Sequence, residues 1–359
     1  MCRRCGHHAR HHGGPLKPRL AVVGAASLIG EALIDELHAR KFSYAELHAL
    51  DDVRHLGHTI AHDRADAAGG AEKLSLGDVA GFDFSRVDMV FFCGRASLAE
   101  HYAEAAAAHA WVIDGSGAFR ARQDVPMVAA DVNPSTLKGV THRGLIALPG
   151  SASVALATVL APLHALAGLA RVEVATYQAV SGSGRSAMEA LASETVAMLS
   201  GRKAKGSAFG RQIAFNVIPQ VDVLDADGVS REERRLLEET RRVLDLPQLG
   251  INVTAVRVPV FFGHSFAVHA SFERPFGPID AAQVLRRATG VSLIEPGSDA
   301  QFPTPAVLAS APDRVYVGRL RPDLTRDQSL NFWIVADNVR KCAAHNAVSV
   351  AQILVNRSH

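Results

Sequence analysis

Residues 19–30 read Arg-Leu-Ala-Val-Val-Gly-Ala-Ala-Ser-Leu-Ile-Gly, an apolar run followed by a turn of small residues. Short apolar runs of this kind form strands that are buried inside parallel sheets. We therefore expect a strand at Arg19–Val23, a turn at Gly24–Gly30 and an amphipathic helix at Glu31–Arg40. Small residues let the backbone approach a phosphate, and the N-terminus of the following helix attracts an anion. The stretch predicts a nucleotide-binding turn.

Strand and helix patterns alternate beyond this turn. Strands are expected at Tyr44–Leu50, Met89–Phe92 and Trp111–Asp114, and a helix at Leu98–His109 separates the last two strands. Alternating β and α units are typical of a doubly wound parallel sheet. The first half of the chain therefore predicts an α/β, Rossmann-like nucleotide-binding domain.

The pattern changes after Pro149. A long apolar helix is expected at Val154–Leu169, and segments with alternation and β-branched residues indicate strands. One helix is expected to begin with acidic residues, which the helix dipole favours at that end. Another long apolar helix is expected at the end of the chain. These later segments are Arg171–Val180, Ile251–Pro259 and Ala267–Phe272 for the strands, and Arg231–Leu244 and Asp337–Val355 for the helices.

The second half is therefore predicted to be an α+β domain with a mostly antiparallel sheet. The last helix is expected to return and pack on the first domain. This gives a nucleotide-binding domain of residues 19–149 plus 336–359, and a second domain of residues 150–335.

Composition excludes several classes of protein. The chain has 359 residues, of which 48% are hydrophobic and 21% charged, which suits two globular domains. The formal charge of +2 gives no case for nucleic acid or a membrane surface. No uncharged apolar stretch reaches the roughly 18 residues of a membrane span. Four cysteines do not make a disulfide scaffold in a chain of this length, so we expect a reduced, cytoplasmic protein.

The first 18 residues lack hydrophobic periodicity and are predicted to be a disordered tail. A Cys-x-x-Cys pair next to histidines could bind zinc. No second ligand pair lies nearby and the flanks cannot fold around an ion, so we expect an N-terminal extension without a metal. The candidate ligands are Cys2, Cys5, His7, His8, His11 and His12.

The glycine turn and the next strand end form a candidate cofactor site. Asp51 lies about 20–27 residues beyond the turn, where a carboxylate accepts the ribose 2′-hydroxyl of NAD and repels the 2′-phosphate of NADP. Arg54 could still hold that phosphate, and a solvated turn would explain Asp51 and Asp52 equally well. The sequence favours NAD over NADP modestly, and a purely structural turn stays open as an alternative. The turn residues proposed for the cofactor are Gly24, Ala25, Ser27, Leu28, Ile29 and Gly30.

Separated blocks of the chain carry a family resemblance. They are Asp114–Arg120, Val125–Asn133, Tyr177–Gly184, Phe215–Gln220, Glu232–Arg235, Arg257–Ser265, Phe302–Pro305, Val317–Arg319 and Val335–Lys341. Together they resemble the aspartate-β-semialdehyde dehydrogenase family over nearly all of residues 19–359. The resemblance implies the glyceraldehyde-phosphate dehydrogenase-like fold, a role in aspartate-family amino-acid biosynthesis, a dimer and an NAD or NADP cofactor. It also implies that residues 19–149 plus 336–359 form the NAD(P)-binding domain and residues 150–335 the substrate and dimerisation domain.

The same resemblance implies roles for individual residues. In the family a cysteine thiolate attacks an acyl phosphate, phosphate leaves, and hydride reduces the thioester, with a histidine as acid and base. His264 falls at that histidine, Arg257 at the residue that grips the substrate carboxylate, and Arg120 at a phosphate ligand. Other substrate positions are Gln178, Glu232 and Arg235, and other cofactor positions are Cys93, Gly94, Ser181, Gly182 and Asn338.

Ser151 stands where the family has its nucleophilic cysteine. A serine hydroxyl is much harder to ionise than a thiol, and an ester accepts hydride less readily than a thioester. We therefore predict that the native thioester reaction is lost, as in the Usg-type paralogues, which the chain resembles. Cys93 and Cys342 are expected to be buried, inert thiols rather than replacements. Further departures from the family are Ser27 for Gly, Gly150 for Asn, Arg235 for Lys and Phe266 for Glu.

Three functions are therefore open. The chain is a semialdehyde dehydrogenase homologue without the native reaction, an enzyme of different chemistry that uses Ser151 with His264 as base, or a regulatory partner. Its assembly would be a homodimer, a tetramer or a hetero-oligomer with a true dehydrogenase. Taken alone, His264 could be a satisfied loop histidine and Arg257 a strand residue paired with a carboxylate. Their spacing inside a matched block favours an ancestral active site.

Overall fold

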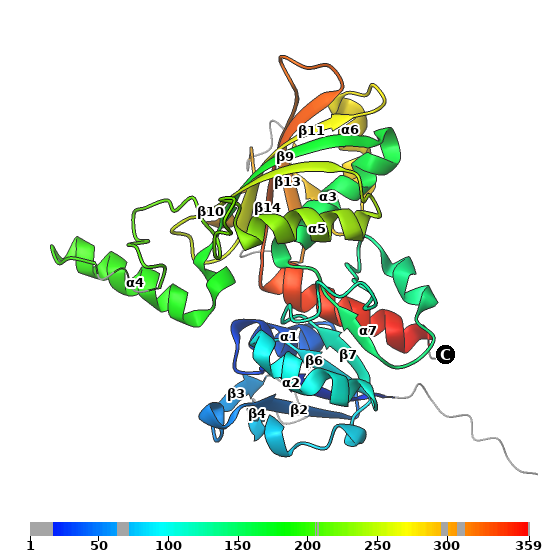
Figure 1. The fold of residues 1–359 in the computed structure, drawn as a ribbon, viewed down its shortest axis with the longest axis vertical. Coiled ribbons are helices and arrows are strands. Elements are labelled where there is room, and N and C mark those ends of the chain that lie inside the picture. Colours follow the sequence, from blue (N-terminus) through cyan, green and yellow to red (C-terminus); the bar gives the residue numbers. More distant parts are fainter. Residues whose placement is uncertain are drawn as a thin grey trace, which may run out of the picture.

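The computed structural model describes residues 17–62, 72–204, 206, 208–295, 301–306 and 313–357. The predicted tail and its candidate zinc ligands lie outside the described residues, apart from Lys17 and Pro18. Two six-stranded sheets, each covered by helices, make up the fold, and Figure 1 shows them one above the other. Among the described helices, none combines the length and apolar character needed to cross a membrane.

The first sheet is parallel throughout, with the strand order β5-β2-β1-β6-β7-β8. Helices α1 and α7 pack on one face of this sheet and α2 packs on the other, so the predicted doubly wound arrangement is confirmed. The elements are β1 (Arg19–Val23), β2 (Glu46–Asp51), β5 (Gly77–Asp78), β6 (Met89–Phe92), β7 (Trp111–Asp114), β8 (Leu145–Ala147), α1 (Leu28–Ala39), α2 (Ala96–Ala107) and α7 (Asn346–Arg357).

The second sheet is mixed, with the order β10-β9-β11-β14-β13-β12. The pairs β9–β10 and β12–β13 are parallel and the three pairs between them are antiparallel, as the sequence predicted for most of this sheet. The strands are β9 (Leu169–Gln178), β10 (Gly250–Arg257), β11 (His264–Phe272), β12 (Val291–Leu293), β13 (Val315–Pro322) and β14 (Ser329–Ala336). Helices α3 (Ser151–Ala167), α5 (Arg231–Leu244) and α6 (Pro278–Arg287) cover one face.

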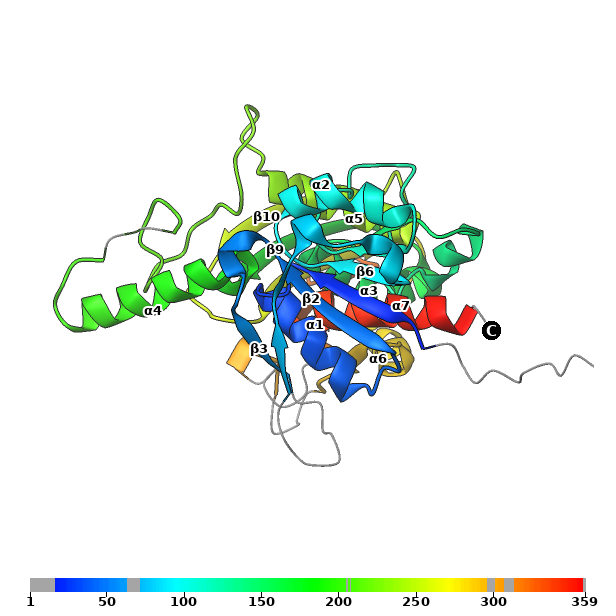
Figure 2. The ribbon, with the colours of Figure 1, turned by 90° about the horizontal axis from the view of Figure 1, so that it is seen from below.

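Smaller elements complete the described chain. Strands β3 (Thr59–His62) and β4 (Glu72–Ser75) form a two-stranded antiparallel sheet. Helix α4 (Arg185–Leu199) extends away from the body of the molecule in both views (Figures 1 and 2). Short 3-10 segments lie at Val53–His55, Val79–Gly81, Phe84–Arg86, Pro134–Gly139 and Val180–Ser183.

Helix α5 has the bounds that its sequence predicted. Ser230 caps it, because its hydroxyl accepts from the Glu233 N–H at 3.2 Å while the Glu233 carboxylate accepts from the Ser230 N–H at 2.7 Å. This reciprocal capping box fixes the first turn of the helix. One face of α5 packs on α3, so the polar residues beside that face are carried toward the start of α3.

The end of the chain differs from its prediction. Instead of one α-helix from Asp337, a π-helical segment at Arg340–His345 precedes α7. The predicted return to the first domain is confirmed, because Ala347, Val348 and Leu354 belong to the core beside β1 and α1. In the π-helical segment Lys341 is 2% exposed, and its Nζ lies 2.7 Å from Asp131 Oδ2.

We expect Asp131→Ala to lower the free energy of unfolding by about 3 kcal/mol, because it leaves the Lys341 ammonium buried without its counter-charge. Urea denaturation measures the change. Asp124→Ala is the matched control, since it breaks an ion pair with Arg122 in which both side chains are exposed, and it should change stability by less than about 1 kcal/mol. Equal losses in the two variants would contradict the importance of the buried pair.

Candidate functional site

A cavity of about 440 Å³ lies where the two halves of the molecule meet. Its walls include the ends of β6, β7 and β9 and the start of α3. The structure gathers here every predicted catalytic and substrate residue and most of the predicted cofactor residues outside the glycine turn. These are Ser151, Gln178, His264, Arg120, Arg257, Glu232, Arg235, Cys93, Gly94, Ser181, Gly182 and Asn338.

The glycine turn borders a second, adjoining cavity of about 550 Å³. Gly24 has a φ of +82°, and a Cβ on it would come 2.4 Å from the Gly94 backbone nitrogen, so only glycine suits this position. Gly24, Ser27, Leu28 and Ile29 line this cavity. Of the other two predicted turn residues, Ala25 and Gly30 are buried and do not line it.

Ser27, which the sequence resemblance places at the family's middle glycine, is the N-cap of α1. Its φ is −76°, its hydroxyl accepts from the Gly30 N–H at 3.0 Å, and it donates to the Cys93 carbonyl at 3.1 Å. The substitution therefore satisfies one free amide of the helix and ties the turn to β6.

The two aspartates after β2 have different roles. The Asp51 carboxylate is buried and accepts from the backbone N–H groups of Ala26 at 3.2 Å and Asp52 at 2.8 Å, which holds the glycine turn against β2. The Asp52 carboxylate accepts from Arg54 at 2.7 Å and also contacts Arg95. This hydrogen bond from Arg54 lowers the pKa of Asp52. Two carboxylates and two guanidinium groups thus stand at this end of the turn.

Helix α3 begins at Ser151, three residues before the predicted start. Its N-cap is Gly150, which has no side chain to cap the helix. The Ser151 hydroxyl has no hydrogen-bond partner among the described residues, although it lines the cavity. An oxygen at a helix N-terminus lies in a positive field, but no base contacts it here.

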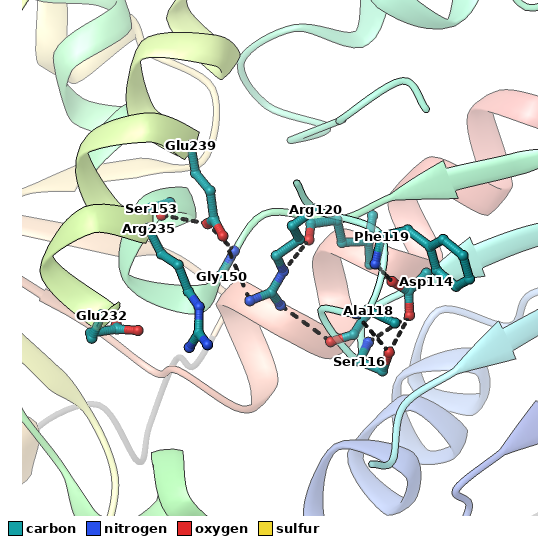
Figure 3. Close-up of polar contacts among 12 residues, drawn as sticks. Asp114, Ser116, Ala118, Phe119, Arg120, Gly150, Ser153, Glu232, Arg235 and Glu239 are labelled. Carbon is teal, nitrogen blue, oxygen red and sulfur yellow. Dashed lines mark hydrogen bonds and ion pairs between the residues drawn. The ribbon is translucent and has the colours of Figure 1, made fainter. Parts of the chain in front are cut away.

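Arg120 lies on the turn that follows β7 (Figure 3). Asp114 organises this turn by accepting from the N–H groups of Ser116 at 2.9 Å and Phe119 at 3.3 Å. The Arg120 guanidinium then donates to the carbonyls of Leu148 at 2.8 Å and Gly115 at 3.3 Å. Both acceptors are neutral, and the Glu239 carboxylate pairs with Arg120 at 3.8 Å, which is beyond hydrogen-bond distance. Arg120 can therefore still donate to an anion.

His264 is a buried, neutral imidazole. Its Nδ1 accepts from the Ala179 N–H at 3.1 Å, and because a backbone amide can only donate, the ring must carry its proton on Nε2. Burial, assisted by the nearby Arg257 cation, lowers the pKa of His264 to about 3. In this tautomer His264 donates a proton from Nε2 and does not serve as a base toward Ser151.

Arg257 is a buried cation that no carboxylate of the described residues pairs. It is 4% exposed, donates to the Ala179 carbonyl at 2.6 Å and lies over the Phe209 ring at 5.6 Å. Among the described residues no acid forms an ion pair with it, and its Nε has no hydrogen-bond partner. Burial lowers the pKa of Arg257 to about 10, and Glu232 opposes this shift. A buried guanidinium with a free donor is suited to bind an anion.

The remaining predicted substrate residues lie on or beside α5. Gln178 Nε2 donates to Glu232 Oε1 at 2.9 Å, while burial raises the pKa of Glu232. Arg235 is exposed at the mouth and pairs with Asp222 at 2.7 Å. Of the departures from the family, Phe266 is fully buried in the core of the second domain, away from the cavity.

Neither described cysteine offers a replacement for the thiol that the sequence resemblance expects at position 151. Cys93 and Cys342 are both free and buried, and burial raises the pKa of each thiol. The expectation that they are buried is therefore confirmed. Both would be un-ionised at neutral pH, and a thiol rather than a thiolate is a weak nucleophile.

Sequence reasoning missed Glu239. This residue lies on α5 and its carboxylate contacts the first turn of α3 and faces Arg120 (Figure 3). The available signal was its spacing: Glu239 follows Glu232 by two helical turns, so both project from one face of α5. Phe209, which packs on Arg257, was missed as well, because no local pattern connects them.

Comparisons with known proteins agree with this arrangement. Residues 19–140 match the semialdehyde dehydrogenase NAD binding domain, and residues 160–341 match the semialdehyde dehydrogenase dimerisation domain. The chain is 38% identical over 336 residues to an aspartate-semialdehyde dehydrogenase of Legionella pneumophila, covering 93% of this chain and 95% of that one. It is 37% identical over 339 residues to a USG-1 protein homolog of Azotobacter vinelandii, covering 94% and 98% of the two chains.

A solved structure shares the fold closely. Aspartate semialdehyde dehydrogenase II of Vibrio cholerae, in complex with ASA, superposes with a TM-score of 0.90 at 35% identity, covering 96% of this chain and 99% of that one.

The state of His264 is directly testable. We expect its imidazole to keep Nε2–H and not to titrate between pH 5 and 8, because its folded-state pKa is about 3. The unfolded chain, with a pKa of about 6.5, takes up the proton first, so the stability due to the neutral ring is complete above pH 6.5 and is lost as the pH falls toward 3. Nitrogen-15 spectra of labelled histidine, assigned with His264→Gln, report both tautomer and titration. A His264 signal that moves with a midpoint near 6.5 would contradict the buried neutral state.

Proposed function

The chain belongs to the semialdehyde dehydrogenase family, and we propose that its cavity binds a small carboxylate-bearing aldehyde beside a nicotinamide dinucleotide without performing the family's thioester step. The observation that carries this proposal is one cavity lined by two arginines, a buried glutamate and a position that has no thiol. Arg257, Arg120 and Glu232 are in place, and Ser151 occupies the position of the nucleophile.

The surroundings of Arg257 support the proposal that the ligand carries a carboxylate. Its guanidinium is desolvated and has no acidic partner among the described residues, so an incoming carboxylate would supply the missing counter-charge. Gln178 and Glu232 lie on the same wall and can orient a second polar group. We propose that Arg120 is the ligand for phosphate, because its contacts are carbonyl oxygens and not carboxylates within hydrogen-bond distance.

The loss of covalent chemistry rests on two features of the site. Ser151 has no hydrogen-bonded base among the described residues. The Ala179 amide occupies Nδ1 of His264, so the ring proton lies on Nε2, the other ring nitrogen. An acyl-serine mechanism needs an unprotonated ring nitrogen within reach of the hydroxyl. The alternative function, a Ser151–His264 hydrolase, is therefore less well supported than a binding protein with a redox scaffold.

A nicotinamide dinucleotide, which would supply or accept hydride when bound, fits the cavity beside the glycine turn. Gly24 and Gly94 pack backbone against backbone and both line this cavity at the start of α1, where the helix N-terminus would meet a phosphate group. Ser181 and Asn338 are hydrogen-bonded to each other and would stand on the nicotinamide side. We propose NAD as the preferred form, because Asp52 neutralises the arginines that a 2′-phosphate would need.

We also propose the domain division of residues 19–149 plus 336–359 for the nucleotide and 150–335 for substrate and dimerisation. The helices of the second half cover one face of its sheet, and the other face lines a shallow hollow of about 430 Å³ that includes His269, Arg319 and Trp333. A homodimer formed through the matched dimerisation domain is the assembly we expect. A tetramer or a hetero-oligomer with a true dehydrogenase would use the same domain.

Restoring the thiol tests the proposed function. We expect Ser151→Cys to gain phosphate-dependent reduction of NAD or NADP by aspartate semialdehyde, at least about tenfold above the wild-type rate, because a thiol at a helix N-terminus ionises more readily. Spectrophotometry at 340 nm measures it. Ser153→Cys is the matched control, since Ser153 lies two residues later on α3, is buried and bonds to Glu239.

Two outcomes of that assay would count against the proposal. Turnover by the wild type would show that another group performs the chemistry. Equal activity in the Ser151→Cys and Ser153→Cys variants would show that position 151 has no special place in the site.

Cofactor preference has its own test. We expect Asp52→Ser to strengthen NADP binding about tenfold relative to NAD, because the serine still caps the 3-10 turn while Arg54 and Arg95 are released. Fluorescence titration with each dinucleotide measures the ratio. Asp83→Ser is the control, because Asp83 caps another 3-10 turn in the same way but accepts its side-chain hydrogen bond from Ser85 and not from an arginine. An unchanged ratio would show that Asp52 does not set the preference.

A further inference from the structure

The carboxylate of Glu239 occupies the space between the start of α3 and Arg120 (Figure 3). Its Oε2 accepts from the Gly150 N–H at 2.6 Å and from the Ser153 hydroxyl at 2.7 Å. Its Oε1 lies 3.8 Å from Arg120 Nη1 and has no hydrogen-bond partner among the described residues. Glu239 is only 4% exposed, so these contacts form in a largely dehydrated part of the cavity wall.

Gly150 makes this approach possible. A Cβ at that position would lie 3.2 Å from Glu239 Oε2 and 3.3 Å from Arg120 Nη1, so any larger residue would have to displace one of them. Gly150 also leaves α3 without a side-chain cap of its own. The carboxylate from α5 therefore takes the place of the missing cap and satisfies an amide that the helix leaves free.

The arrangement places an internal anion at the position where an external one would bind. A helix N-terminus and a guanidinium whose hydrogen bonds go to carbonyl oxygens are the two features that attract a phosphate group. Glu239 is bonded to the first and faces the second. A phosphate on Arg120 would bring a second negative charge close to a buried carboxylate, and repulsion between like charges is strong where water is excluded.

We propose that Glu239 is a specificity-determining residue, an internal anion that weakens phosphate binding at Arg120 and so favours ligands without a phosphate group. This inference rests on the proposed function in one respect, because it takes Arg120 as the phosphate ligand. When the subsite is empty, the carboxylate balances the Arg120 charge. An aldehyde held by its carboxylate on Arg257 brings no charge to Arg120 and avoids the repulsion.

The variant Glu239→Gln removes the negative charge at this position and keeps a side chain that can cap α3. In Glu239→Gln the amide oxygen can still accept from Gly150 and Ser153, while the neutral amide nitrogen faces Arg120. We expect this variant to bind inorganic phosphate about tenfold more tightly than the wild type, as measured by isothermal titration calorimetry. Glu238→Gln is the matched control, since it removes a charge from the adjacent, exposed position of α5 and should leave the affinity unchanged.

A second variant and a second measurement guard against a purely structural effect. Glu239→Asp keeps the charge, so it should bind phosphate no more tightly than the wild type even if it loosens the start of α3. The rise of the melting temperature with phosphate concentration gives the same comparison for a variant of lowered stability. Tightening in both the Gln and Asp variants would overturn the inference, because it would follow from space and not from charge.

Arg120→Ala distinguishes failure of this inference from failure of the proposed function. If phosphate binding depends on Arg120 but Glu239→Gln does not tighten it, Glu239 is only a helix cap and the inference is overturned, while the phosphate ligand stands. If no variant binds phosphate in a way that depends on Arg120, the proposed phosphate site is wrong and the inference falls with it.

Discussion

The first turn of α3 is the point on which both halves of the molecule depend. Strand β8 of the nucleotide-binding sheet ends at Ala147, and four residues later the helix that forms the core of the second half begins. The body of α3 is apolar and buried, so its axis is set by packing, whereas its first turn forms part of the cavity wall. Because Gly150 cannot cap this turn, the helix is held at that end by a carboxylate from α5. Stability and ligand binding therefore share one contact.

The cavity is also defined by the way its buried charges are balanced. Arg257 has carbonyl and aromatic neighbours, Arg120 has two carbonyl acceptors and a carboxylate at 3.8 Å, and Glu232 is hydrogen-bonded to a neutral amide. Burial disfavours each of these charges unless a partner compensates it. Arg257 has no acidic partner among the described residues, so the site is less stable empty than occupied, and a small anionic ligand supplies the missing interaction. This physical argument for a binding site does not require Ser151 to react.

Regular periodicity allowed much of the fold to be predicted, and side-chain contacts between distant segments set the limit. The parallel strands from Arg19 to Asp114 and the bounds of α5 follow from local apolar patterns and a capping box. The start of α3 was placed three residues late, because Ser151 and its neighbours are small and carry little apolar signal. The π-helical segment before α7 was missed, since no local pattern distinguishes it from α-helix. Within the site, the resemblance supplied Arg120, Arg257 and His264, but Glu239 and Phe209 act through contacts with residues more than 40 positions away.

Replacement of a thiol by a hydroxyl at position 151 changes the chemistry far more than the structure. The two side chains are similar in size, so the helix and its packing need not adjust, yet the hydroxyl does not ionise near neutral pH. The surrounding side chains would then serve to bind a ligand and not to react with it. His264 fits this view, because its Nδ1 is fixed by a backbone amide and its Nε2–H can still hold a carbonyl oxygen. A hydrogen-bond donor, a guanidinium for a carboxylate and a cradle for a dinucleotide are sufficient for recognition. The thioester reaction requires in addition a thiol, and Ser151 carries a hydroxyl instead.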